Sequence, residues 1–522
     1  MVIIIDRLIR GLNSTSAHLT MCFFLLYYYI RCSGIIIYTD IKQRVYVYYL
    51  KNNKIYTLKQ VRGSFDMSGI PVEKNKDYEI DIDNLGYEGE GVGQFNNFKI
   101  FVPGALIGER VEIKIVKVSK NFAFGKLIRV IKASADRIEP LCSLKRCGGC
   151  QLLHLAYDAQ LRYKKHRVQE CIERIGRLDP SLVHDTIGMK NPYRYRNKAQ
   201  FPVGMKNGNI VIGFFAPRSH EVIDTPSCLI QDDMSNQVIK VVKDWAQHNS
   251  ISVYDERDRT GILRHVMVRK AFKTGEMMVV IVTNGCEMPF KDELIERLRT
   301  KIPAVKSIIQ NINREATNVV LGRDNKTLFG SDRIVDYIGN LKFQISPLSF
   351  FQVNPYQTEA LYNKVIEYAD LSGNETVIDA YCGTGAISLF VAQKVKKVYG
   401  VEVVEAAIAD AKKNAAENGI CNAQFIAGKS ETVIPELYKQ GMKADVIIVD
   451  PPRKGCELGL LTTIASMKPE KLIYVSCDPG TLARDLRYLS QNGFEVRDIQ
   501  PFDMFAQTAH VETVVLMSRG DK

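Results

Sequence analysis

The sequence predicts a multidomain α/β protein, in which a small β-barrel and a central α+β region precede a C-terminal open α/β sheet. Three observations support this order: short alternating runs between glycines over residues 74–134, three closely spaced cysteines just after them, and apolar strands alternating with helical segments from about Gln344. Strands that alternate with helices are typical of a parallel sheet, whereas successive alternating strands are typical of a barrel. We expect four parts, namely residues 1–66, 67–134, 135–343 and 344–522.

The composition is that of an ordinary globular protein, with 46% hydrophobic and 25% charged residues in a chain of 522. A net charge of +12 favours a polyanionic partner such as a nucleic acid, although only weakly. The chain has 12 cysteines and no recognisable secretory signal, which indicates reduced thiols or metal ligands rather than disulfides. We therefore expect a cytoplasmic protein.

The first 66 residues differ from the rest of the chain. They hold eight of the 24 tyrosines and nine Lys/Arg against three Asp/Glu, which is half of the net charge. Their longest apolar run, Met21 to Ile30, is too short for the roughly 18 residues that span a bilayer. We hypothesise that translation starts at Met67 and that residues 1–66 form an atypical extension; the alternative is a membrane-associated arm.

Residues 74–134 predict a small antiparallel barrel. Asp77–Asp83 and Val111–Val118 alternate strictly between apolar and polar residues, Phe122–Ile131 is similar, and glycines mark the turns. Small barrels of the oligonucleotide-binding type commonly bind RNA, whereas a solvated basic face is the alternative interpretation. The basic residues on these strands are Lys114, Lys117, Lys120, Lys126, Arg129 and Lys132.

A cysteine cluster follows the barrel. Cys142, Cys147 and Cys150 have the spacing C-x4-C-x2-C with two glycines, a pattern that indicates a metal site. Four thiolates would hold zinc or an iron–sulfur cluster, and Cys228 is the best candidate for the fourth ligand. The spacing differs from the C-x3-C-x2-C of radical enzymes, so we expect a structural centre.

A helix is predicted from about Tyr157 to Ile175, ended by Gly176. We interpret its polar side as solvated or as a contact for phosphates; it carries Arg162, Lys164, Lys165 and Arg167. Beyond the helix, Asn207-Gly208 between apolar runs predicts a hairpin. Tyr193–Lys198 interleaves aromatic and cationic residues, which suits RNA as well as a strand edge.

The C-terminal part carries the signs of a nucleoside-binding sheet. Val377–Asp379 is a strand that runs into the glycine turn Tyr381-Cys-Gly-Thr-Gly385, which allows a ligand to approach the backbone. Ser388 stands where a dinucleotide motif needs its last glycine, which disfavours dinucleotide binding. Glu402 ends the second strand, where its carboxylate can accept hydrogen bonds from both hydroxyls of a ribose.

Two further strand ends complete the predicted site. The fourth strand ends in Asp450-Pro-Pro-Arg453, a rigid turn that can hold a planar base with Asp450 on its polar edge. The fifth strand ends in Ser476-Cys477-Asp478, and in open α/β sheets ligands bind at the carboxyl ends of the strands. We therefore interpret Cys477 as a nucleophile rather than an inert buried thiol.

Taken together, these motifs resemble the RNA uridine-5 methyltransferases of the TrmA/RumA family, most closely the bacterial 23S rRNA enzymes of the RlmCD type. The resemblance covers about residues 70–522 and includes Ser349–Asn354 and Gln507–Glu512. It implies that the barrel is a TRAM domain and that the C-terminal part is a Rossmann-like methyltransferase domain. It also implies a monomer that binds RNA and does not associate with a membrane. It implies S-adenosylmethionine bound by Gln352, Tyr381, Glu402 and Asp450, Cys477 as nucleophile, Glu512 as base, and a [4Fe–4S] cluster on Cys142, Cys147, Cys150 and Cys228.

The chemistry explains the residue types. Carbon 5 of uracil is a weak nucleophile, and addition of the Cys477 thiolate to carbon 6 activates it. A carboxylate such as Glu512 can then remove the proton from carbon 5, although Glu512 could equally be a surface carboxylate of the last strand. The alternatives are the same reaction on tRNA, or an RNA-binding iron–sulfur protein without catalysis. Cytosine-5 methyltransferases are disfavoured, because their nucleophile stands in a proline–cysteine turn.

Overall fold

The computed structural model describes residues 35–39, 45–51, 54–61, 70–144 and 146–520, and it divides the chain into two units, residues 1–73 and 74–522. The first unit contains an antiparallel sheet of β1 (Ile35–Thr39), β2 (Val45–Lys51) and β3 (Lys54–Val61). Met67 and the apolar run of residues 21–30 lie outside the described residues. Among those described, no helix is both long and apolar enough to cross a membrane.

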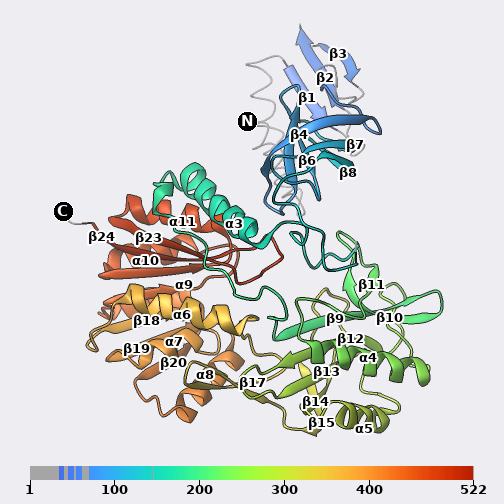
Figure 1. Cartoon of the computed structure of the whole chain (residues 1–522). Coiled ribbons are helices and arrows are strands. Elements are labelled where there is room, and N and C mark those ends of the chain that lie inside the picture. The colour runs from blue at the N-terminus through green and yellow to red at the C-terminus, as the bar shows by residue number, and fades with distance from the viewer. Residues whose placement is uncertain (1–34, 40–44, 52–53, 62–69, 145, 521–522) are drawn as a thin grey trace. The chain divides into compact units, whose positions relative to one another are not determined.

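The second unit begins with the predicted barrel, which closes in the strand order β4-β5-β6-β8-β7 (Figure 1). Alternate residues point inward, so Ile80 and Ile82 of one strand and Ile113 and Ile115 of another are buried in the barrel core. The prediction of a small barrel is confirmed, but the barrel is not wholly antiparallel, because β6 and β8 pair in parallel. Its strands are β4 (Asp77–Leu85), β5 (Gly91–Phe95), β6 (Phe98–Val102), β7 (Arg110–Val118) and β8 (Phe122–Lys132).

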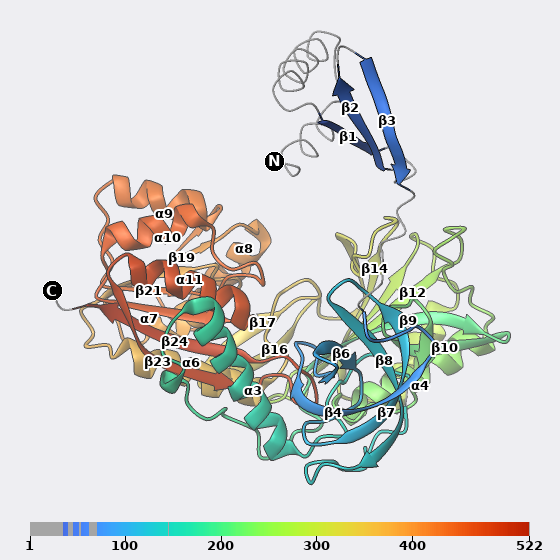
Figure 2. The same ribbon diagram turned by 90° about the horizontal axis from the view of Figure 1, so that it is seen from above.

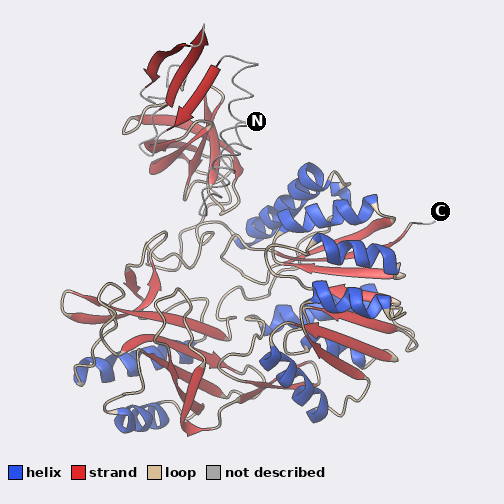
Figure 3. Ribbon diagram, turned by 180° about the vertical axis from the view of Figure 1, so that it is seen from behind, coloured by secondary structure: helices blue, strands red, loops and turns tan. Residues whose placement is uncertain are grey.

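The central region is a seven-stranded mixed sheet in the order β11-β10-β9-β12-β13-β14-β15. Trp245 of α4 and Leu298 of α5 are buried in its core, and Figure 3 shows these helices beneath the strands. Asn207 and Gly208 both have positive φ, as the predicted hairpin between β9 and β10 requires. The elements are β9 (Lys198–Lys206), β10 (Asn209–Phe215), β11 (Val222–Asp224), α4 (Asp233–His248), β12 (Leu263–Lys270), β13 (Met277–Thr283), α5 (Lys291–Lys301), β14 (Val305–Ile312) and β15 (Asp324–Gly330).

The C-terminal sheet has the order β20-β19-β18-β21-β22-β24-β23, and all its strands run in one direction except β24, which pairs antiparallel with both β22 and β23. Neighbouring residues face opposite sides: Ile448 packs in one hydrophobic core and Ile447 in another, so the strands are buried on both faces. The hairpin of β16 (Ile334–Ile338) and β17 (Leu341–Ile345) precedes this sheet. The strands are β18 (Thr376–Ala380), β19 (Lys397–Glu402), β20 (Ala423–Ala427), β21 (Val446–Val449), β22 (Lys471–Ser476), β23 (Phe494–Phe502) and β24 (Glu512–Arg519).

Helices cover both faces of this sheet (Figure 3). Leu361, Leu389 and Ile408 belong to the hydrophobic core on one face, whereas Ile434, Leu460 and Leu486 belong to the core on the other. The carboxyl ends of the parallel strands therefore remain free to carry side chains with chemical roles. The helices are α6 (Pro355–Ala369), α7 (Ala386–Ala392), α8 (Glu405–Glu417), α9 (Ser430–Lys439), α10 (Leu458–Met467) and α11 (Pro479–Gln491).

Helix α3 (Tyr157–Cys171) packs against the C-terminal domain, far along the chain from its own position. It continues into a π-helical turn (Ile172–Gly176), is followed by a 3₁₀ turn (Pro180–Leu182), and runs beside α11 and β23 (Figure 2). The predicted helix is confirmed, but the predicted solvated face is wrong in two positions, because Lys164 and Arg167 are buried. Both cations point toward the C-terminal domain and find partners there. The four predicted domain boundaries stay predictions.

Candidate active site

The carboxyl ends of β18, β19, β21 and β22 and the start of β24 surround a cavity of about 1160 Å³. Because β24 is antiparallel to β22, with Thr513 opposite Ser476, its first residue lies at the same edge as Cys477. The cavity brings together the side chains predicted to bind a nucleoside and to react: Gln352, Tyr381, Glu402, Asp450, Cys477 and Glu512.

The glycine turn after β18 forms one wall of this cavity. Tyr381 has φ +64° and Gly383 φ +55°, and nothing lies within 4 Å of the space that a Gly383 side chain would fill. The Glu402 carboxylate accepts hydrogen bonds from Gly383 N at 3.2 Å and Val404 N at 2.9 Å, which fix it at the end of β19. The Tyr381 hydroxyl donates to Glu431 at 2.8 Å.

Asp379, one of the last residues of β18, is a site residue that the sequence reasoning did not single out. Ser388 donates to its Oδ2, but its buried Oδ1 has no hydrogen-bond partner and the residue lines the cavity. Its pKa is raised to about 7, mainly by burial; the Ser388 hydrogen bond opposes the shift and the nearby charge of Asp450 adds to it. A buried acceptor without a partner suits a cationic ligand group such as an ammonium.

Two more carboxyls stand at this edge, Glu512, which is buried, and Asp450, which is partly buried. Burial raises the pKa of Asp450 to about 7. Burial also raises the pKa of Glu512 well above its ordinary value, and the nearby charge of Asp450 adds to the shift while Arg453 opposes it. A carboxyl whose pKa is raised in this way is better suited to proton transfer as a general base than an ordinary carboxylate.

The Cys477 thiol is partly buried among these acids. Its pKa is raised to about 12: burial is the largest cause, the charges of Glu512 and Asp450 add to the shift, and the cation of Arg453 opposes it. The residue that follows, Asp478, caps α11 by accepting hydrogen bonds from Gly480 N at 3.0 Å and Thr481 N at 2.9 Å. The strand and the capped helix thus fix the position of the cysteine in between.

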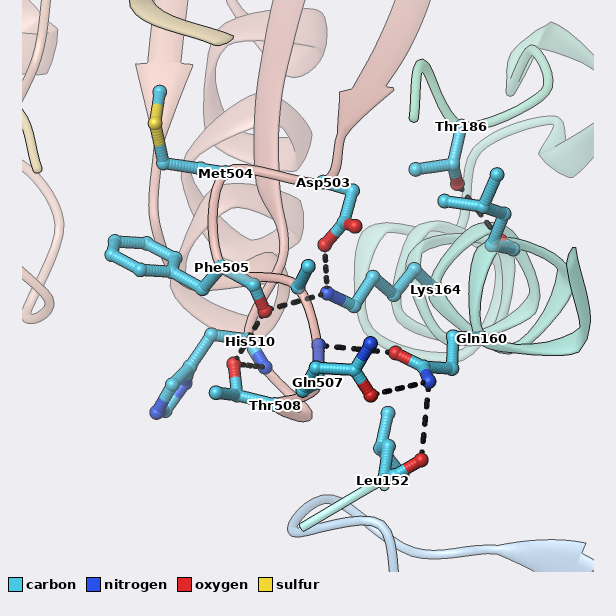
Figure 4. A network of polar contacts seen from close by, with 12 residues as sticks. Leu152, Gln160, Lys164, Thr186, Asp503, Met504, Phe505, Gln507, Thr508 and His510 are labelled. Atoms are coloured by element: carbon cyan, nitrogen blue, oxygen red, sulfur yellow. Dashed lines mark hydrogen bonds and ion pairs between the residues drawn. The ribbon is translucent and has the colours of Figure 1, made fainter. Parts of the chain in front are cut away.

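The loop between β23 and β24 lies against α3 (Figure 4). The buried ammonium of Lys164 pairs with Asp503 and donates to Phe505 O at 3.0 Å. Gln160 donates to Gln507 Oε1 at 3.0 Å and accepts from Gln507 N at 3.1 Å. Since Phe505, Thr508 and His510 line the cavity, this network determines where they stand.

The same loop also contacts the segment that follows the cysteine cluster. Gln151 N and Leu152 N both donate to Gln507 O, at 3.1 and 3.0 Å, and Gln507 has φ +68°. The side-chain amide of Asn197 donates to Gln352 O at 2.8 Å. Hydrogen bonds to backbone carbonyls therefore connect the central region to two segments that line the cavity, those of Gln352 and of Thr508.

The predicted metal ligands line a second cavity of about 720 Å³. Burial raises the pKa of Cys147, Cys150 and Cys228, and neighbouring thiols raise all three further, so the side chains lie near one another. Among the residues that the structure describes, no three His, Cys, Asp or Glu side chains are grouped as a metal-binding set. The predicted ligands in this second cavity are Cys142, Cys147, Cys150 and Cys228. Gly149 and Arg196 line both this cavity and the cavity at the sheet edge.

The predicted basic face of the barrel is partly neutralised. Arg129 pairs with Glu112 at 2.5 Å across β7 and β8, and Lys114 pairs with Asp77 at 3.5 Å. Within residues 193–198, Tyr195 is buried and donates to Ala506 O at 3.0 Å, so this aromatic belongs to the core. An RNA contact by these basic residues stays a prediction.

Comparisons with protein families match most of the described chain. A family model described as tRNA (Uracil-5-)-methyltransferase matches residues 156–520, and a TRAM domain model matches residues 71–128. An uncharacterized RNA methyltransferase of Clostridium tetani is 55% identical over 455 residues, which are 87% of this chain and 99% of that protein. One of Clostridium acetobutylicum is 56% identical over 456 residues, with the same shares of the two chains.

A solved structure shares the fold over most of the chain. The tRNA (uracil-54, C5)-methyltransferase of Pyrococcus abyssi, in complex with S-adenosyl-L-homocysteine, superposes with a TM-score of 0.68 at 26% identity. The match covers 84% of this chain and 99% of that one.

Proposed function

The chain belongs to the tRNA (uracil-5-)-methyltransferase family, and from this premise we propose that it methylates carbon 5 of a uridine in 23S rRNA. The methyl donor is S-adenosylmethionine, and the reaction passes through a covalent bond between Cys477 and carbon 6 of the uracil. The single observation that carries this proposal is the cavity that Cys477 and Glu512 share with the glycine turn of β18.

The cavity residues fit the donor. When bound, S-adenosylmethionine supplies an activated methyl group on a sulfonium. Glu402 would accept hydrogen bonds from the ribose and Asp450 would hold the polar edge of the base, and the turn at Tyr381 and Gly383 leaves room for a ligand against the backbone. The unpartnered Oδ1 of Asp379 would accept a hydrogen bond from the ammonium of the methionine moiety. Gln352, which lines the same cavity, would also contact the donor.

Cys477 performs the first chemical step. Its thiolate adds to carbon 6, and the electron pair of the C5–C6 double bond moves into an enolate that makes carbon 5 nucleophilic. Because burial and two acids disfavour the thiolate, the cation of Arg453 is the group that favours it in the described surroundings. The ring must be approached from its face, so the target uridine leaves its stack.

Glu512 completes the reaction. Once carbon 5 carries the methyl group, its proton must leave before the C6–S bond breaks and the double bond returns. A buried carboxylate with a raised pKa suits this proton transfer, and general bases contribute about 10²–10⁴-fold to a rate. His510 lines the same wall; burial lowers its pKa to about 4, so it stays neutral near pH 7.

We also propose a [4Fe–4S] cluster on Cys142, Cys147, Cys150 and Cys228. Buried thiols that raise one another's pKa are stabilised as thiolates by a bound cationic centre, so the donor set fits. The cluster would hold the segment that precedes Gln151, which contacts the loop of Gln507. Protein purified without oxygen should contain about four irons; stoichiometric zinc would exclude the cluster.

The choice of 23S rRNA rests on the resemblance of the cysteine cluster and barrel to the rRNA enzymes. The tRNA alternative is favoured by the Pyrococcus abyssi protein, which is named for uracil-54 of tRNA. The proposed enzyme acts in the cytoplasm as a monomer.

The test is methyl transfer to 23S rRNA and to tRNA from cells that lack the gene, followed by mapping of 5-methyluridine. Cys477→Ser should abolish the transfer, and Glu512→Gln should accumulate a covalent protein–RNA adduct. Cys421→Ser, which changes an exposed thiol, is the control and should retain full activity. Normal methylation by Cys477→Ser would exclude the mechanism, label in tRNA alone would favour the alternative substrate, and no transfer at all would favour a non-catalytic RNA-binding protein.

A further inference from the structure

Tyr87 lies in the turn between β4 and β5 of the barrel and reaches the catalytic sheet edge. Its hydroxyl donates to Asp478 Oδ2 at 2.5 Å, and Asp478 is the residue directly after Cys477. The other oxygen of the same carboxylate caps α11, so a rigid group holds the tyrosine. A side chain of the barrel therefore contacts the residue next to the proposed nucleophile.

Arg167 of α3 covers one face of the Tyr87 ring, with its guanidinium carbon 3.9 Å from the ring centroid. The arginine is itself buried and donates to Ala509 O, which fixes the stack. The turn is anchored to the same helix, because Tyr163 donates to Gly86 O at 2.8 Å and Asn84 donates to Glu170 at 3.2 Å. The ring is therefore ordered without any ligand.

The Tyr87 side chain nevertheless remains 52% exposed. A residue that only braced the barrel against the catalytic domain would gain from burying this apolar ring. A rigid ring with a cation over one face and half of its residue exposed has an arrangement on which unpaired bases can stack in RNA-binding proteins.

A second observation extends this surface. Arg218 pairs with Glu88 of the same turn at 3.6 Å and lies over the ring of Phe124 at 5.5 Å. Phe124 contacts Phe101 and Phe122, and Lys117 lies 5.9 Å from its centroid. Aromatic rings and cations thus continue from the turn onto β6 and β8, as on a track for a single strand.

We propose that the Tyr87 ring, backed by Arg167, is a stacking platform for an unpaired RNA base that flanks the target uridine. The inference rests on the proposed function, because it places the target at Cys477. Extruding that uridine leaves its neighbours without a stacking partner, and Tyr87 replaces the lost stack beside the nucleophile.

The experiment combines protein variants with abasic RNA. A synthetic oligonucleotide centred on the mapped uridine carries single abasic substitutions at successive flanking positions. Binding and single-turnover methylation are measured for the natural chain, Tyr87→Leu and Tyr87→Phe. Tyr438→Leu is the control, because Tyr438 is also a partly exposed tyrosine whose hydroxyl is hydrogen-bonded, on α9.

One flanking position should behave differently from the others. Its abasic form should bind the natural chain and Tyr438→Leu about 5- to 150-fold more weakly, the factor that corresponds to about 1–3 kcal/mol per stacked base. In Tyr87→Leu the additional loss of affinity for this abasic RNA should disappear. Tyr87→Phe keeps the aromatic ring, so it should show the same loss of affinity as the natural chain. The effect should fall on RNA affinity more than on the rate of the bound complex.

The proposal is overturned if every abasic substitution weakens the natural chain and Tyr87→Leu by the same factor. It is also overturned if Tyr87→Leu slows single-turnover methylation equally on all RNAs without a change in binding, which is what a bracing residue predicts. Failure of the proposed function is a separate result: the natural chain would then methylate none of the oligonucleotides, whatever their flanking bases.

Discussion

Replacing Lys164 by methionine removes the cation of a fully buried ion pair. The side chains of Lys164 and Asp503 are both 0% exposed, and the ammonium also donates to Phe505 O. In Lys164→Met the Asp503 carboxylate keeps the Tyr157 hydroxyl at 2.6 Å as a partner but loses its countercharge. Breaking a buried pair in this way costs about 3–5 kcal/mol.

The lost free energy should destabilise the loop between β23 and β24, which the Lys164–Asp503 pair holds against α3. A local opening made easier by about 3–5 kcal/mol corresponds to a fall in hydrogen-exchange protection of roughly 10²- to 5 × 10³-fold over residues 503–511. Because this loop carries His510 and leads to Glu512, its displacement should also lower the methylation rate by about 10²-fold, the loss expected for a 1 Å misplacement.

The assay is hydrogen exchange with mass spectrometry on peptides that cover residues 503–511, together with single-turnover methylation. Lys165→Met is the matched control: the neighbouring Lys165 pairs at 2.8 Å with Asp185, whose side chain is 95% exposed, so its loss should leave the loop unchanged. Lys164→Met/Asp503→Asn should recover most of the protection, because it leaves no buried charge unpaired.

A fall in protection of less than tenfold in Lys164→Met would refute this reasoning. So would a double variant that is less protected than either single variant, because the two side chains would then act independently. A loss of protection equal in the Lys165→Met control would mean that α3 as a whole, rather than the buried pair, had been disturbed.

Further predictions concern the acids and thiols. Arg453→Met should raise the pKa of Cys477 and slow its alkylation by iodoacetamide at pH 8, whereas Glu512→Gln removes a negative neighbour and should speed it; the reverse order on the Cys477 peptide would contradict the assigned charges. The raised pKa of Glu512 predicts that kcat/KM starts to fall, as the pH is lowered, well above the pH at which an ordinary carboxylate is protonated, since the proposed base must be ionised; a profile flat to pH 5 would exclude this. Cys228→Ser should lower the bound iron and weaken protection around Gln151; unchanged iron content would remove Cys228 from the ligand set.

Much of the fold and the candidate site could be predicted because the signals are local. Strict alternation predicted the barrel strands, and an apolar run followed by glycines or prolines predicted each strand end of the C-terminal sheet. Since parallel strands place their carboxyl ends at one edge, strand order alone brought Glu402, Asp450 and Cys477 to one cavity.

Helix α3 shows where local signals fail. Lys164 and Arg167 look like a solvated face, because cations are rarely buried unless they are paired. Their partners, Asp503 and Ala509, come from a loop more than 300 residues further along the chain. Asp379 was missed for a related reason. Its place in a strand can be predicted, but the surrounding side chains decide that one of its buried oxygens has no hydrogen-bond partner, and these come from other parts of the chain.

The sequence by itself determined the element types and the chemical groups at the ends of the strands, because these follow from periodicity and turn chemistry. Only the tertiary structure decided how the groups are held and what their pKa values are. Contact of Tyr87 with Asp478, burial of the Lys164 pair and the crowding of acids around Cys477 all join distant segments. Burial and charge depend on what surrounds a side chain in space, and a linear pattern does not contain that information.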